Sequence, residues 1–258
     1  MLDTFHYALG ALSGGLVGFT LGLVGGGGSI LAVPLMVYLV GVSNPHVAIG
    51  TSALAVAVNA ATGLASHARA GTVKWRCGLM YAGAGVLGAL AGSSAGKAVD
   101  GHKLLFLFAI VMVVVGLVML RGRRNVGIAG AACNRTNAPR VLGYGLGTGI
   151  FSGFFGIGGG FLIVPGLVAS TRMPIINAIG TSLIAVTAFG FTTAANYALS
   201  GLIDWPLAGV FIAGGVAGGL GGTVLARRLS GQGTLTTVFA ALIFVVAGYM
   251  LWKSAGAF

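Results

Sequence analysis

The chain has no glutamate and only three aspartates, Asp3, Asp100 and Asp204, against fourteen lysines and arginines. Charged residues make up 7% of the 258 positions, compared with roughly 25% in soluble domains, whereas 57% are hydrophobic and 48 residues are glycine. Too little polar material remains to cover a soluble globule. Because apolar stretches of ~20 residues recur along the whole length, the composition predicts an all-α polytopic membrane protein.

The acids are also missing from the places where ion-coupled transport and catalysis need them. All three lie at segment ends or in loops, which disfavours cation transport and carboxylate-based proton coupling. No two histidines have the spacing of a helical metal site, and no nucleophile elbow is present. We therefore expect no enzyme, no metal and no cofactor. The formal net charge of +11 does not indicate nucleic acid, because the basic residues sit in short loops between apolar spans.

Only two cysteines occur, Cys77 and Cys133. The charge pattern described below places both on the cytoplasmic side, where thiols stay reduced, so a structural disulfide is not expected. The N-terminus lacks the basic region of a signal peptide and is interpreted as the first span.

The apolar runs predict ten hydrophobic segments, five in each half, with the second and seventh short or broken. An offset of 130 residues aligns Gly50-Thr51-Ser52 with Gly180-Thr181-Ser182, and Trp75 with Trp205. We interpret residues 1–125 as a first membrane repeat, 126–140 as a basic cytoplasmic linker and 141–258 as a second repeat. An odd number of segments per repeat makes consecutive copies enter the bilayer from opposite sides, so the sequence predicts two inverted-topology repeats.

The loop charges agree with this topology. If all ten segments cross, one face collects eleven basic residues, which are Arg69, Lys74, Arg76, Arg121, Arg123, Arg124, Arg135, Arg140, Arg172, Arg227 and Arg228. The other face has only Lys97, Lys103 and Lys253. By the positive-inside rule the first face is cytoplasmic and both termini are periplasmic.

Glycine occurs in two distinct patterns. Four-residue spacings, as in Gly14, Gly18 and Gly22, are typical of close helix packing in lipid. The clusters 25–28 and 156–160 instead place nearly consecutive glycines in mid-membrane, immediately before the short segments, where they weaken a continuous helix. Backbone freed at that depth must line a cavity or be buried in protein. Two such interruptions, meeting near the midplane, would aim the positive ends of two helices at an anion.

Polar residues near these interruptions complete a candidate anion site. Hydroxyl residues begin the third and eighth segments in both copies, and two asparagines lie in otherwise apolar runs. For each hydroxyl, a helix cap or a bond to its own helix is the structural alternative. The candidate substrate-binding residues are Gly27, Gly28, Ser29, Thr51, Ser52, Asn59, Gly158, Gly159, Gly160, Thr181, Ser182 and Asn196.

The repeats, each with a glycine cluster followed by apolar residues and a proline, resemble the TauE/SafE family of sulfite exporters. The resemblance covers nearly the whole chain and rests on Gly156 to Gly160 with Pro165, on Gly25 to Ser29 with Pro34, and on the two Gly-Thr-Ser strings. The first repeat departs from the family pattern, with Gly26 in place of an apolar residue and Ser29 in place of a glycine. The resemblance implies transport of small sulfur-containing anions across the bacterial cytoplasmic membrane.

Three functions remain open at this stage. The leading one is export of sulfite, sulfoacetate or a related sulfonate by alternating access, driven by the membrane potential. The second is uptake of an organic sulfonate or carboxylate, coupled to protons either through His67 or through titration of the substrate itself. The third is a non-transporting membrane subunit. The expected partners are a small anionic substrate and the lipid bilayer, with a homodimer left open.

Overall fold

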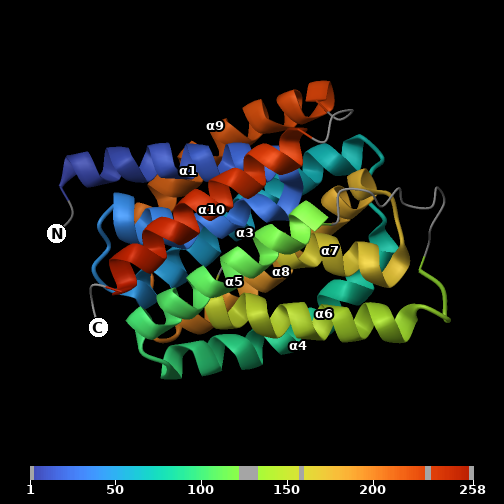
Figure 1. Cartoon of the computed structure of the whole chain (residues 1–258), viewed down its shortest axis with the longest axis horizontal. Coiled ribbons are helices and arrows are strands. Elements are labelled where there is room, and N and C mark those ends of the chain that lie inside the picture. The colour runs from blue at the N-terminus through green and yellow to red at the C-terminus, as the bar shows by residue number, and fades with distance from the viewer. Residues whose placement is uncertain (1–2, 122–132, 157–159, 230–233, 256–258) are drawn as a thin grey trace.

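The computed structural model describes residues 3–121, 133–156, 160–229 and 234–255, and every regular element in those ranges is helical. Figure 1 shows an elongated bundle in which most helices run roughly along one axis. In chain order the elements are α1 (Thr4–Val24), the 3-10 helix η1 (Gly25–Leu31), α2 (Ala32–Pro34), the π-helix η2 (Leu35–Leu39), α3 (Pro45–Arg69), α4 (Trp75–Ala98), α5 (Gly101–Arg121), α6 (Ala138–Phe155), α7 (Gly160–Thr171), α8 (Ile175–Ala198), α9 (Trp205–Leu229) and α10 (Thr234–Ala255).

The ten predicted hydrophobic segments are confirmed as helical elements. The second corresponds to η1, α2 and η2 together, and the seventh to α7. With 12 residues, α7 rises only ~18 Å, which is too short to cross ~30 Å of hydrocarbon alone. Within the described residues, five helices are long and apolar enough to span a membrane: Thr4–Leu23, Pro45–Arg69, Trp75–Ala98, Ile175–Ala198 and Trp205–Leu225.

Local capping explains where several helices begin. Asn44 accepts a hydrogen bond from the backbone N–H of His46 at 2.9 Å, and Pro45 occupies the first turn of α3. Asp100 accepts from the N–H groups of His102 and Lys103 at the start of α5. These backbone donors, that of Lys103 first, hold the pKa of the Asp100 carboxyl below its ordinary value. Asp100 is therefore used as a helix cap.

The centre of the bundle is the antiparallel pair of α3 and α8. Gly50 lies against Tyr197, Gly63 against Leu183, and Gly180 against His67, so positions on α3 descend as those on α8 ascend. Phe189 and Tyr197 are completely buried. Positions along α3 and α8 can therefore be used to compare how far along the bundle other residues lie.

Glycine stripes join the two halves, as expected for close packing in lipid. On α1, Gly18 lies so near Gly215 of α9 that a Cβ would overlap its carbonyl oxygen. On α6, Gly149 meets Gly85 of α4 in the same way. With offsets of 130 and 131 residues, the second contact is the repeat counterpart of the first. Each half therefore packs its first helix onto the fourth helix of the other half, so the repeats are interleaved rather than stacked.

Both termini lie at one end of the bundle, and α5 ends and α6 begins at the opposite end (Figure 1). This is the parity expected of ten segments that all change side. The many exposed large apolar side chains, such as Leu12, Leu87 and Val245, fit a surface that faces lipid.

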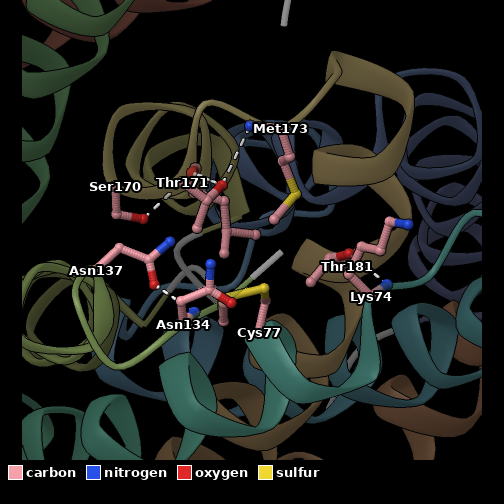
Figure 2. The surroundings of a disulfide bond; sticks show 10 residues. Lys74, Cys77, Asn134, Asn137, Ser170, Thr171, Met173 and Thr181 are labelled. Atoms are coloured by element: carbon pink, nitrogen blue, oxygen red, sulfur yellow. Dashed lines mark hydrogen bonds between the residues drawn. A yellow bond between two sulfur atoms is a disulfide. The ribbon is translucent and has the colours of Figure 1, made fainter. Parts of the chain in front are cut away.

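The expectation of no disulfide is wrong. Cys77, in the first turn of α4, and Cys133, which precedes α6, are joined by a disulfide with a Cα–Cα distance of 5.3 Å (Figure 2). Both residues are buried. Their 56-residue separation gave no sign of the pairing. The prediction rested on the reducing conditions of the cytoplasm. Nothing in the sequence indicated that the chain before α6 lies beside the start of α4.

Candidate functional site

The first glycine cluster ends the α-helix, as predicted. α1 stops at Val24, and Gly25–Leu31 continues as a 3-10 helix, longer than the 3–4 residues usual for that conformation. Gly28 lies against the backbone of Thr20 and Leu21, where a Cβ would overlap the Leu21 nitrogen. The Thr20 hydroxyl lies within hydrogen-bond distance of three carbonyl oxygens, those of Leu16, Val17 and Gly28. The Oγ1···O distance to Gly28 is 3.4 Å. Only glycine permits this fold-back.

The second cluster also ends a helix. Gly156 adopts a left-handed conformation with φ of 68°, and its N–H bonds to the carbonyls of Ser152 and Gly153. A Cβ on Gly156 would overlap the Ile49 side chain of α3. Gly158 and Gly159 lie outside the described residues, and Gly160 is the first, buried residue of α7. Two interruptions of the α-helix at the predicted positions are thus confirmed.

The interrupted segments contact each other, because η1 packs against α7. The first residue of the second cluster and the last glycine of the first cluster lie at different depths in the bundle. Gly156 rests on Ile49, whereas Gly28 rests on Leu21, which shares a small cavity with Thr62 of α3. Ile49 and Thr62 differ by thirteen positions, or roughly 20 Å along the helix. The convergence of the two clusters on one point stays a prediction, because Gly158 and Gly159 lie outside the described residues.

The predicted hydroxyls make structural hydrogen bonds. The backbone N–H of Asp204 donates to Thr51 Oγ1 at 3.0 Å, and that of Lys74 donates to Thr181 Oγ1 at 2.9 Å. Ser52 and Ser182 donate to carbonyls three residues earlier in their own helices. All four residues are buried. Since α3 and α8 are antiparallel, the two Thr-Ser pairs lie toward opposite ends of the bundle.

Asn59 is the predicted residue with the most unusual surroundings. Its side chain is 5% exposed, and neither its amide nitrogen nor its amide oxygen has a hydrogen-bond partner among the described residues. It packs on Gly215 of α9 and lines a cavity of about 20 Å³ together with Thr62, Ser66 and Thr223. In the other half, the equivalent position is Phe189, which packs on Gly85. The repeats therefore place an amide in one half and a phenyl ring in the other.

Asn196 lies elsewhere, close to the end of α8, and belongs to a polar cluster that the sequence did not reveal. Its amide nitrogen donates to Ser93 at 2.6 Å and to Ser94 at 3.1 Å. Lys97 Nζ donates to Asn196 Oδ1 and to Ser200, both at 2.8 Å. Lys97 was visible in the sequence only as a loop charge. Its pairing depends on how α4 and α8 pack, which no spacing rule predicts.

Acidic and metal-ligating side chains contribute little to the interior. Asp204 Oδ1 accepts from the N–H of Leu207 and caps α9, just as Asp100 caps α5. No group of three or more His, Cys, Asp or Glu side chains comes together within the described part of the chain. The interior offers instead a buried amide without a described hydrogen-bond partner, interrupted backbone and helix ends.

The fold and these features define a multi-pass helical membrane protein with duplicated, glycine-interrupted helices. The chain belongs to the family described as sulfite exporter TauE/SafE, which it matches over residues 10–250. It is a membrane transporter of that family.

Relatives support the assignment along the whole chain. A probable membrane transporter protein of Xylella fastidiosa (strain Temecula1) is 53% identical over 249 residues, covering 94% of each chain. YunE of Bacillus subtilis, also a probable membrane transporter protein, is 26% identical over 261 residues and covers 93% of this chain and 95% of its own. MJ0441 of Methanocaldococcus jannaschii bears the same description and is 26% identical over 189 residues, 68% of each chain. No solved structure matches the chain.

Proposed function

We propose that the protein exports a small sulfur-containing anion, sulfite or a related sulfonate, from the bacterial cytoplasm by alternating access. The observation that carries the proposal is the pair of interrupted helices, η1 and α7, packed against each other inside the bundle. Backbone N–H groups at such interruptions favour anions, and no acidic side chain among the described residues lies within a spanning helix to repel them. The family assignment supplies the sulfur chemistry.

The substrate contacts that we propose combine backbone and side chains. They are spread along the pathway rather than gathered at one point: Gly27, Gly28 and Ser29 in η1, Gly158, Gly159 and Gly160 at the second interruption, Thr51 and Ser52 with Thr181 and Ser182 toward the two ends, and the amides of Asn59 and Asn196. Among them Asn59 is the strongest, because a buried amide without partners costs about 1–3 kcal/mol unless a ligand or water satisfies it. We place it at the centre of the anion site.

The structure corresponds to a closed conformation in this account. The cavity beside Asn59, about 20 Å³, accommodates about one water molecule, and a sulfite ion of four heavy atoms does not fit. Transport therefore requires α9 and α1 to separate from α3. We propose that the two inverted repeats rock against each other to open the site alternately, with both termini periplasmic and the basic end of the bundle cytoplasmic.

The driving force follows from the charge of the substrate. An inside-negative potential contributes about 2.3 kcal/mol per charge per 100 mV toward expulsion of an anion. Export therefore needs no coupling ion.

The experiment is sulfite efflux from proteoliposomes containing the purified protein. Asn59→Leu keeps the side-chain size and removes both polar groups, and we expect it to abolish saturable efflux. Ser13→Ala is the matched control, since the Ser13 hydroxyl is equally buried and also lacks a described partner. Efflux by Asn59→Leu at the wild-type rate would overturn the site. Absence of sulfite efflux from the wild type would overturn the function.

Proton-coupled uptake of a sulfonate or carboxylate is the second candidate, and His67 favours it. Its Nδ1 lies 2.9 Å from Thr72 Oγ1, at the end of α3 beside Gly180. A pH gradient with the acid side outside distinguishes the two functions. It would drive proton-coupled uptake, which His67→Gln should abolish, but it would not affect potential-driven export.

A further inference from the structure

A groove on the lipid-facing side of the bundle lies between α5 and α6. α5 packs mainly on α10 and α6 packs mainly on α4, so α5 and α6 contact each other only slightly, and α7 contributes Leu162 to the lining of the groove. Its volume is about 620 Å³, and its walls include Val111, Val114, Phe151 and Leu162. These walls are almost wholly apolar. Volumes of roughly 300–1,000 Å³ are typical of sites for small organic ligands.

One end of this groove carries a positive charge. Arg140, in the first turn of α6, lines it and makes no hydrogen bond or ion pair with any described residue. The three acids precede α1, α5 and α9, at the opposite end of the bundle, so none can neutralise Arg140. The N-terminal end of the α6 helix dipole adds to the positive potential there. Arg140 is exposed and can therefore pair with an anion from outside the chain.

The length of the groove matches one leaflet of a bilayer. Arg140 and Phe151 are eleven residues apart on α6, which corresponds to ~16 Å, or about half of a ~30 Å hydrocarbon core. A molecule with its head at Arg140 and its tail at Phe151 would therefore span from the interface to mid-membrane. Tyr144 follows Arg140 by one helical turn, also lines the groove and is 45% exposed. Amphipathic aromatic rings such as this are enriched at the interface between water and the hydrocarbon core.

Two glycines keep the groove open. Gly143 and Gly147 both line it, and a Cβ at either position would meet no atom within 4 Å. They differ from the other glycines of α6, Gly145, Gly149 and Gly153, which are packed tightly on α4. Their lack of side chains therefore serves no helix contact and leaves space beside α6.

We infer that the groove binds an anionic phospholipid, with its phosphate at Arg140 and one acyl chain along the apolar walls between α5 and α6. The groove is separate from the cavity beside Asn59, which is lined by α1, α3, α8 and α9, although α7 borders both the groove and the proposed substrate pathway. Basic pockets between membrane helices on the positively charged side bind anionic head groups by the same electrostatics.

The test is lipid binding by the detergent-purified protein, measured by native mass spectrometry. The probe is an equimolar mixture of phosphatidylglycerol and phosphatidylcholine with identical acyl chains. We expect the wild type to retain one phosphatidylglycerol in preference to phosphatidylcholine. Arg140→Gln should lose that preference, while Arg76→Gln, on the same face but outside the groove, should keep it.

Filling the groove gives the second arm. Gly147→Leu should lose the bound lipid altogether, and Gly143→Leu serves the same purpose if the first variant does not fold. Gly209→Leu is the control, because a Cβ at Gly209 of α9 also meets no atom. Undiminished lipid retention by the groove-filled variants would overturn the assignment. The assignment would also be overturned if the wild type were a dimer and Gly147→Leu dissociated it, because the occupant of the groove would then be a second copy of the chain.

Discussion

The backbone N–H of Lys74 donates a hydrogen bond to Thr181 Oγ1, at an N···O distance of 2.9 Å (Figure 2). Lys74 precedes α4 of the first half and Thr181 lies in α8 of the second, so the bond ties the halves together. Its repeat counterpart, from the N–H of Asp204 to Thr51 Oγ1, does the same at the other end of the bundle. The threonine of each Gly-Thr-Ser string thus accepts a hydrogen bond from the residue that precedes a helix of the other half.

We predict that Thr51→Val and Thr181→Val each lower stability by about 0.5–1.5 kcal/mol, because each leaves a partly buried backbone N–H without its acceptor. The double variant should lose the sum, since the two bonds lie at opposite ends of the bundle. Thermal unfolding in detergent measures this. Thr51→Ser and Thr181→Ser keep the acceptor and should stay close to the wild type; a loss as large as that of the valine variants would disprove the role of the hydroxyl.

The glycine contacts give a sharper steric prediction. Gly18→Ala and Gly149→Ala each place a methyl group on a facing carbonyl oxygen, of Gly215 and Gly85 respectively. We expect a loss of about 1–3 kcal/mol or more from each, as for other overpacked interiors. Gly147→Ala, two residues from Gly149 on α6, meets nothing and should be neutral or slightly stabilising. Equal melting temperatures for the Gly147 and Gly149 variants would refute the close packing.

Much of this fold could be predicted from the sequence. Glycine runs at 25 and 156 marked the helix interruptions because consecutive glycines disfavour helix whatever surrounds them. The partner of Thr51 could not be predicted, because it depends on which helix of the other half packs alongside. The same limit applied to Asn196, whose position near the end of α8 becomes significant only once Lys97 of α4 lies beside it.

The disulfide leads to a further prediction. Purified protein should react with maleimide at no cysteine until it is reduced, because both thiols are joined. Cys133→Ser should lower stability by up to about 4 kcal/mol, the chain-entropy value for closing a loop of this length. Thermal unfolding of the wild type with and without reductant measures the same contribution of the disulfide to stability. Two thiols titrating in the denatured, unreduced protein would contradict the pairing.

The side of the membrane on which this disulfide lies needs its own test, because two rules disagree. Basic residues mark this end of the bundle as cytoplasmic, whereas disulfides persist mainly in oxidising compartments. We predict that the charge rule prevails, since orientation is fixed during insertion, before pairing. A phosphatase reporter active only in the periplasm should be active when fused after Phe258. Activity of a cytoplasmic reporter at that point would reverse the orientation and place the disulfide outside.

The most direct measurement of the central claim is sulfite efflux from proteoliposomes under an imposed potential. The account predicts that an inside-negative potential accelerates efflux by the wild type without any ion gradient. It also predicts that Gly160→Val, which adds a side chain at the start of α7, inserts normally but does not transport. Efflux that ignores the potential, or that continues at the wild-type rate through Gly160→Val, would contradict an anion pathway built on the interrupted helices.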